Sequence, residues 1–296
     1  MAKDKTKPRP ELAAKREAIR QQQAVARAKR RRRLALNWLI AIVIIGLVVS
    51  GITFVVLHVK AGARELLAQG PDNVTQITPP HATSDGLAVL ANPGVTLASD
   101  AIRVDIHVDL QSGDAVNAMQ YYGPSLASLA AEGKIELYVH LHSSQDATYK
   151  NTASTRGAEA AACADTVGAF ITYLQAAFNS ASLAPSANQI GFTDAQLQGQ
   201  FPAAIGLTGA DLRSFKTCYS QRATYDFVTA MDAANQTAAV PDNPDYATGV
   251  LATPVFLANY ASVDIADDIN AATSQTKSEA DTWALLEDAA SQMSLS

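Results

Sequence analysis

The sequence predicts an α/β domain on the outer side of a membrane, preceded by one transmembrane helix. Two patterns of hydrophobic residues lead to this prediction. A continuous apolar run covers residues 34–59 of the 296-residue chain, and an alternating segment, a helical segment and a second alternating segment follow one another between residues 102 and 141. Two strands joined by a helix usually pair in parallel through a right-handed crossover.

The apolar run has the length of a membrane-spanning helix. No charged residue occurs from Trp38 to Leu57, a stretch of 20 residues. As an α-helix it would be about 30 Å long, which matches the hydrocarbon thickness of a bilayer. A cleaved signal peptide would have a shorter apolar region and a small-x-small cleavage site, which the residues after Val59 match poorly. We therefore expect residues 34–59 to be an uncleaved transmembrane helix in contact with membrane lipid.

Charge is distributed unevenly on the two sides of this run. Residues 1–33 hold 13 of the 23 basic residues and only 3 of the 28 acidic ones. Basic residues next to a transmembrane helix stay in the cytoplasm. We therefore expect residues 1–33 to be a basic cytoplasmic segment of a single-pass protein of the cell membrane, with the acidic C-terminal part extracytoplasmic. The position of the basic cluster explains it better than nucleic-acid binding, so no nucleic-acid partner is expected.

Residues 60–100 are predicted to be a linker and residues 101–296 a folded domain. Pro and Gly are frequent in the first range, and no hydrophobic period is sustained there. Period-two alternation then predicts strands at 102–110 and 135–141. The apolar spacing between these strands predicts a helix over 114–132, which Gly133 ends.

The second half of the domain is predicted to be mainly helical. Thr193 and Thr208 belong to the residue types that are favoured at helix N-caps. The expected elements are an Ala-rich helix at 154–178, a helical region at 193–235 broken near Pro202 and at Gly206–Gly209, a short strand at 253–257 and an amphipathic helix at 277–293.

Three local sequences resemble the DsbA-like branch of the thioredoxin fold, as found in actinobacterial membrane-anchored proteins. Residues 104–123 are similar to the family's strand-to-helix corner, which usually reads Asp-Phe-Gln-Cys-Pro-x-Cys. Residues 155–163 are similar to its Ala-rich helix with one cysteine, and Thr253-Pro254 is similar to its cis-proline corner. The resemblance covers about residues 95–290 and implies a thioredoxin-like α/β fold with a helical insertion.

The same resemblance implies that the redox centre of the family is missing. Aligning residues 109–111 on the family's corner places Ser112, Gly113, Asp114 and Ala115 where the Cys-x-x-Cys motif would be. In the family the first cysteine attacks a substrate disulfide as a thiolate, and the second resolves the mixed disulfide. Serine and alanine cannot carry out these steps, so no catalytic residue and no cofactor is expected at this degenerate site.

Ser112 has two other conceivable roles. A hydrolytic nucleophile needs a base within reach, but the sequence around Ser112 lacks a Gly-x-Ser-x-Gly turn and shows no triad order. Ser112 or Asp114 is instead expected to cap the helix that follows.

The chain has two cysteines, Cys163 and Cys218, which lie outside any Cys-x-x-Cys motif. In an oxidising extracytoplasmic compartment a single pair most often forms a structural disulfide. A redox-active pair and two free thiols are the alternatives. In the resembling family a second cysteine pair at similar places ties the long helix to the end of the insertion, and the resemblance implies the same bond here.

Three histidines fall on the polar sides of the two expected strands. His107 alternates with apolar residues, and His140 and His142 share one face because residues two apart in a strand point the same way. On neighbouring strands they could converge with Asp105 and Asp109 as a transition-metal site or a pH-sensitive cluster. Helices on both sheet faces would instead bury and hydrogen-bond these groups, and no metal site is predicted.

The sequence therefore predicts a redox-inactive binding or folding-assistance module, with enzymatic activity left uncertain but not favoured. By resemblance, the degenerate site at 112–115 and the corner at Thr253 and Pro254 would hold an extracytoplasmic protein or peptide. Two alternatives stay open. One is an enzyme, either a thiol-disulfide oxidoreductase that uses Cys163 and Cys218 or a different chemistry at the old site. The other is a structural subunit of an envelope complex.

Overall fold

A computed structural model describes residues 70–180, 191–270 and 276–293. All of them belong to the unit Arg64–Ser296. The predicted cytoplasmic segment at 1–33 and the predicted transmembrane helix at 34–59 lie outside the described residues and stay predictions. Within the ranges that are described, no helix is both long and apolar enough to span a bilayer.

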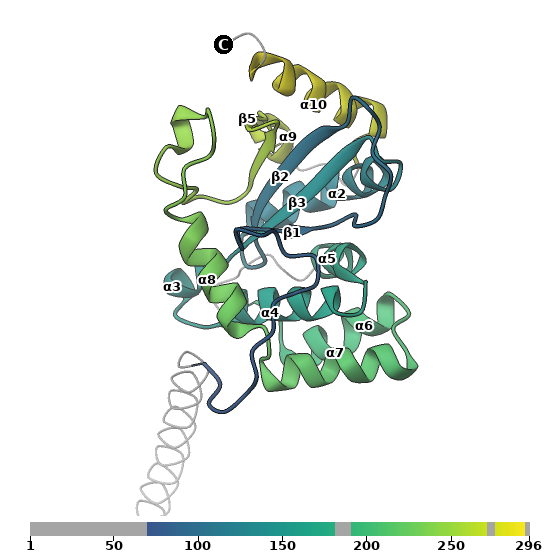
Figure 1. The fold of residues 1–296 in the computed structure, drawn as a ribbon, viewed down its shortest axis with the longest axis vertical. Helices are drawn as coiled ribbons and strands as arrows, with labels where there is room; N and C mark the ends of the chain where they lie inside the picture. The colour runs from purple at the N-terminus through teal and green to yellow at the C-terminus, as the bar shows by residue number, and fades with distance from the viewer. Residues whose placement is uncertain (1–69, 181–190, 271–275, 294–296) are drawn as a thin grey trace, which may run out of the picture. The chain divides into compact units, whose positions relative to one another are not determined.

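A mixed five-stranded sheet forms the centre of the described fold (Figure 1). Its strands are β1 (Val89–Leu90), β2 (Ile102–Asp109), β3 (Ile135–His142), β4 (Val255–Ala258) and β5 (Ala261–Ser262). The spatial order is β1-β3-β2-β4-β5. The long strands β2 and β3 pair in parallel along their whole length, as predicted, whereas the other pairs are antiparallel.

Helices connect the strands and cover the sheet. α2 (Gly113–Ala131) joins β2 to β3, a helical insertion separates β3 from β4, and two helices follow β5 (Figure 1). The insertion contains α3 (Gln145–Tyr149), α4 (Ala153–Asp165), α5 (Phe170–Asn179), the π-helix η1 (Gln196–Gln200), α6 (Phe201–Ala204), α7 (Gly209–Gln221), α8 (Tyr225–Asn235) and the 3₁₀-helix η2 (Pro244–Tyr246), and the last two helices are α9 (Ala266–Asn270) and α10 (Glu279–Met293).

Local sequence signals explain both ends of α2. Ser112 is extended, and its side-chain oxygen accepts a hydrogen bond from the N–H of Ala115 at 3.2 Å. After the helix, Gly133 has a φ of +71°, and a Cβ there would lie 2.2 Å from the carbonyl oxygen of Thr96. The predicted helix over 114–132 and its serine cap are thus confirmed.

The two faces of the sheet differ in chemistry. Alternate residues of β2 and β3 are apolar and face α2. Phe256 of β4, which lies opposite Ile106 of β2, contacts the ring of Tyr122 of α2 on this face. The opposite face carries polar side chains and faces α8, where His140 contacts Asn235. The polar side chains of that face are Arg103, Asp105, His107 and Asp109 of β2 and Glu136, Tyr138, His140 and His142 of β3.

The predicted linker is wrong over its last part. β1 lies within the range 60–100 and pairs with β3. The buried side chain of Asn92 donates to the carbonyl oxygens of Ala130 and Ile135, both at 3.0 Å, and accepts the N–H of Leu137 at 3.1 Å. The apolar stretch around β1 is too short to show a period, so only its long-range pairing reveals that it belongs to the domain.

The helical half of the domain is more broken than predicted. The single helix expected over 154–178 is two helices, α4 and α5, because Gly168 adopts a φ of +68° between them. Arg222, with a φ of +56°, adds a break between α7 and α8. Thr193 caps as expected, since its hydroxyl accepts the N–H of Gln196 at 3.3 Å, whereas Thr208 occupies the N-cap of α7 without a side-chain hydrogen bond.

Candidate functional site

The strand-to-helix corner and the proline loop meet in space. The hydroxyl of Ser112 donates to the carbonyl oxygen of Thr253 at 3.2 Å, although the two residues are 141 positions apart. The Thr253-Pro254 peptide bond is cis, as the resemblance implied. The structure thus places the N-terminus of α2 next to the cis-proline corner.

The contacts of Ser112 are those of a capping residue. Its buried hydroxyl bonds only to main-chain groups, the N–H of Ala115 and the carbonyl of Thr253. In the part of the chain that the structure describes, no side-chain base bonds to this hydroxyl. Hydrolysis would require a contact between a nucleophile and a base, and the described residues show none at Ser112.

The segment before the cis-proline presents free main-chain groups. Leu251 is 66% exposed, which is unusual for a large apolar side chain here. Over the described ranges, the N–H groups of Leu251, Ala252 and Thr253 find no hydrogen-bond partner, and the hydroxyl of Thr253 is buried without one. Such unpaired N–H groups beside a sheet can donate hydrogen bonds to the carbonyl groups of an added peptide.

A buried carboxyl group supports the corner from behind. Asp109 accepts the N–H of Gln111 at 2.8 Å, the hydroxyl of Ser154 at 2.5 Å and the N–H of Gln145 at 2.9 Å. Burial raises the pKa of Asp109 to about 6, and these hydrogen bonds oppose the rise. The network ties the end of β2 to the start of α3 and to the start of α4.

The three histidines converge on the polar face beneath α8. The rings of His107 and His140 stack with centroids 4.0 Å apart, and Nδ1 of His107 lies 3.0 Å from Nε2 of His142. Burial lowers the pKa of His107 well below its ordinary value and lowers the pKa of His142 to about 4, against the opposing effect of Asp232. Both rings are therefore neutral at neutral pH.

Both ring nitrogens of His140 are hydrogen-bonded. Its Nε2 lies 2.9 Å from Oδ1 of Asp105, and its Nδ1 lies 2.9 Å from Oδ1 of Asn235, whose amide nitrogen donates to the carbonyl of Leu87. Asp105 and Asn235 therefore hold the ring of His140 through both of its nitrogens. Burial alone would raise the pKa of Asp105, but hydrogen bonds from His140 and Arg103 hold it below its ordinary value.

Of the two arrangements expected for the histidines, a metal site or a buried hydrogen-bonded group, this geometry is the second. Four ring nitrogens of the cluster are engaged by neighbouring protein groups: both of His140, Nδ1 of His107 and Nε2 of His142. Across residues 70–180, 191–270 and 276–293, no group of three or more His, Cys, Asp or Glu side chains is arranged to hold a metal ion.

We expect the free energy of unfolding to decrease as the pH falls from 7.5 to 4.5. Histidine in the unfolded chain titrates near 6.5, whereas His107 and His142 titrate lower in the fold. Their contribution is therefore complete above about pH 6.5 and is lost as the pH falls towards the folded pKa, at about 1.4 kcal/mol per pH unit for each ring. The raised pKa of Asp109 has the opposite effect: it increases the free energy of unfolding as the pH falls from about 6 to 4. This gain offsets the loss caused by one of the two histidine rings.

Urea unfolding at several pH values measures this dependence. His142→Gln should give a shallower pH profile than the wild type. His81→Gln is the control, because His81 lies outside the cluster and is partly exposed, where its ring pairs with Asp165 at 2.9 Å. A wild-type stability that stays level or increases on acidification would contradict the assignment of neutral buried rings.

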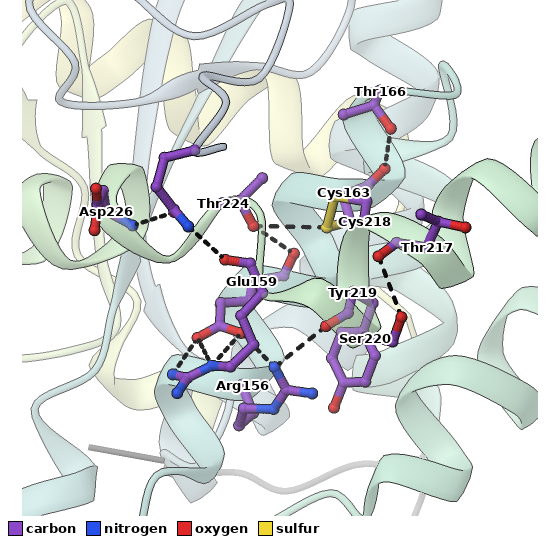
Figure 2. The surroundings of a disulfide bond; sticks show 12 residues. Arg156, Glu159, Cys163, Thr166, Thr217, Cys218, Tyr219, Ser220, Thr224 and Asp226 are labelled. Atoms are coloured by element: carbon purple, nitrogen blue, oxygen red, sulfur yellow. Dashed lines mark hydrogen bonds and ion pairs between the residues drawn. A yellow bond between two sulfur atoms is a disulfide. The ribbon is translucent and has the colours of Figure 1, made fainter. Parts of the chain in front are cut away.

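Cys163 of α4 and Cys218 of α7 form the predicted disulfide, with their Cα atoms 5.8 Å apart (Figure 2). Both sulfur atoms belong to buried residues of the helical insertion. Over the described residues no free cysteine remains. The corner at 112–115 therefore has no thiol.

Removing this disulfide should destabilise the domain. The bond closes a loop of 55 residues, for which the chain-entropy model predicts about 4 kcal/mol. We expect Cys163→Ala with Cys218→Ala to lower the free energy of unfolding by about 2–5 kcal/mol, measured with urea. A reduced wild-type protein as stable as the oxidised one would contradict this expectation.

A buried ionic cluster next to the disulfide escaped the sequence analysis. Glu159 of α4 is fully buried and pairs with Arg156 (Figure 2). It also pairs with Arg222, whose Nη2 lies 2.7 Å from Oε1 of Glu159. The guanidinium groups also lie over aromatic rings, Arg156 3.9 Å from the ring centre of Tyr219 and Arg222 4.5 Å from that of Tyr225. In the sequence, this cluster was indicated only by Arg156 and Glu159, two opposite charges three positions apart in an Ala-rich helix.

Comparison with known proteins identifies the fold. No model of a protein family matches the sequence, and no curated protein does. The MdbA protein of Actinomyces oris, a thiol-disulfide oxidoreductase, aligns with a TM-score of 0.51 and 18% identity over 64% of this chain and 84% of its own. MdbA of Corynebacterium diphtheriae has a TM-score of 0.46 and 14% identity over 68% of this chain and 98% of its own. DsbG of Mycobacterium tuberculosis has a TM-score of 0.45 and 16% identity over 67% of this chain and 93% of its own.

The alignment with the A. oris protein supports the predicted fold class. The described domain has a DsbA-like thioredoxin fold, with a mixed sheet, α2 at the corner and a helical insertion. At 18% identity the likeness concerns the fold and not the activity.

Proposed function

We propose that this protein is a DsbA-like thioredoxin-fold module that binds extended polypeptide segments outside the membrane and performs no thiol-disulfide exchange at its corner. One observation carries the proposal. Both cysteines are bonded to each other on α4 and α7, while Ser112 and Ala115 occupy the corner beside the cis-proline.

The chemistry of the corner supports binding rather than exchange. Exchange begins with a thiolate that attacks a disulfide sulfur, and a second thiol must then release the product. The Ser112 hydroxyl is committed to the N–H of Ala115 and the carbonyl of Thr253. Ser112 therefore cannot supply the thiolate nucleophile, and Ala115 cannot supply the resolving thiol.

The surroundings of the corner suit an extended peptide. The exposed side chain of Leu251 offers an apolar contact, and the N–H groups of residues 251–253 offer main-chain hydrogen bonds. The N-terminus of the 19-residue helix α2 lies beside them and favours a carbonyl or carboxylate group of the ligand. In this proposal, residues 34–59 hold the module at the membrane and residues 1–33 stay in the cytoplasm.

Replacing Leu251 with Asp tests the peptide-binding proposal. The change removes the exposed apolar contact and adds a charge beside the free N–H groups, so we expect affinity for an unfolded polypeptide to fall by about 5–30-fold. The measurement is fluorescence anisotropy of labelled, reduced and carboxymethylated lactalbumin with the full-length protein in nanodiscs.

Leu97→Asp provides the matched control for this experiment. Leu97 is another exposed leucine of the domain, and it lies outside the corner. Its replacement should leave the affinity unchanged. Equal losses in both variants, or no binding by the wild type, would count against the corner as a peptide site.

A further inference from the structure

A cavity of about 320 Å³ lies over the polar face of the sheet, beside α8 and the chain that follows it. Its volume is in the range of small-molecule sites, roughly 300–1,000 Å³. Its lining combines apolar and polar side chains. The apolar ones include Leu87, Val240 and Val250, and the polar ones include Arg103, His107 and His140. Ser112, Thr253 and Pro254 do not line it, so it is separate from the peptide corner.

The charges around the cavity are already paired within the protein. Arg103 makes two hydrogen bonds of 2.7 Å to Asp105, and His140 donates to the same carboxylate. The carboxylate of Asp85 accepts the hydroxyl of Thr83 and a main-chain N–H. A charged ligand would enter without a free counter-charge, and an unpaired buried charge is strongly unfavourable. The site therefore favours an uncharged ligand.

One polar atom in the wall has no protein partner. The Nδ1 atom of His107 faces Nε2 of His142, whereas Nε2 of His107 bonds to none of the described residues. The carboxylate of Asp232 lies 3.7 Å from Nδ1 of His142, which favours a proton on that atom. Nε2 of His142 is then an acceptor, and Nδ1 of His107 donates to it. A neutral imidazole has one donor and one acceptor, so Nε2 of His107 is an acceptor.

We propose that this cavity binds an uncharged small molecule with a hydroxyl group on an apolar body, of the class of phenols and alcohols. The hydroxyl donates to Nε2 of His107, and the apolar body packs against Leu87, Val240 and Val250. The proposal is independent of the peptide corner.

Calorimetric titration of the full-length protein in nanodiscs tests the ligand class, with empty nanodiscs as the blank. Phenol should bind saturably with one molecule per chain. Anisole, which lacks the O–H donor, and benzoate and benzylamine, which are charged, should each bind at least about tenfold more weakly. Anisole as strong as phenol would overturn the role of His107, and stronger binding of benzoate or benzylamine would overturn the argument from paired charges.

Two matched variants locate the binding site. Ala239 is exposed and lines the cavity, so Ala239→Trp should obstruct it and weaken phenol binding at least about tenfold without disturbing the core. Ala233→Trp introduces the same side chain at an exposed position of α8 outside the cavity and should leave phenol binding unchanged. No saturable binding by the wild type, or equal binding by the wild type and Ala239→Trp, would overturn the proposal.

Discussion

Replacing Ser112 and Ala115 with cysteine is expected to create thiol-disulfide exchange activity that the wild type lacks. Position 112 caps α2, where the helix dipole and free N–H groups favour a thiolate. The pKa of a thiol introduced there should therefore lie below the unperturbed value of about 8.5. Reduction of insulin disulfides by the full-length double variant measures the gain, which the nearby carboxylate of Asp114 would moderate by like-charge repulsion.

A second cysteine pair within α2 serves as the control for this experiment. Asn117→Cys with Gln120→Cys has the same spacing but lies away from the helix N-terminus, and it should show only background activity. Introduced thiols at 112 and 115 that never pair in a folded protein would mean that the corner is misplaced. Wild-type activity that disappears with Cys163→Ala would instead favour the oxidoreductase alternative.

Replacing Glu159 with Gln is expected to cause the largest loss of stability of any single change considered. The carboxylate lies fully buried between the guanidinium groups of Arg156 and Arg222. Its neutralisation removes the buried carboxylate that both guanidinium groups share, and breaking a buried ion pair typically costs about 3–5 kcal/mol. The free energy of unfolding in urea measures the effect.

Asp194→Asn is the control for the buried cluster. Asp194 also contacts Arg156, at 3.4 Å, but its side chain is 61% exposed, so solvent screens the pair. We expect this change to cost less than about 1 kcal/mol. Similar losses in the two variants would show that burial does not distinguish the two carboxylates.

Much of the fold follows from short-range patterns in the sequence. Period-two alternation is a property of a single strand, so β2 and β3 could be placed before their pairing was known. The start and end of α2 were equally accessible, because Ser112 and Gly133 act through groups only a few residues away. The pairing of Cys163 with Cys218 was implied by the resemblance. It is also the only intramolecular disulfide that two cysteines allow.

The contacts that define both candidate sites depend on residues distant in sequence. The free N–H groups beside Leu251 and the contact of Ser112 with Thr253 arise only when β4 docks beside β2. The proposed acceptor role of Nε2 of His107 depends on Asp232, which α8 places 3.7 Å from Nδ1 of His142.

The sequence by itself determined the order of the main elements, the capped corner without a thiol and the polar side of the two long strands. The tertiary structure alone decided that this polar side is buried, that His107, His140 and His142 share one network, and that β1 belongs to the domain. The reason is physical. Strand period and helix capping depend on neighbours along the chain, whereas burial, protonation and ion pairing depend on which distant segments exclude water around a group.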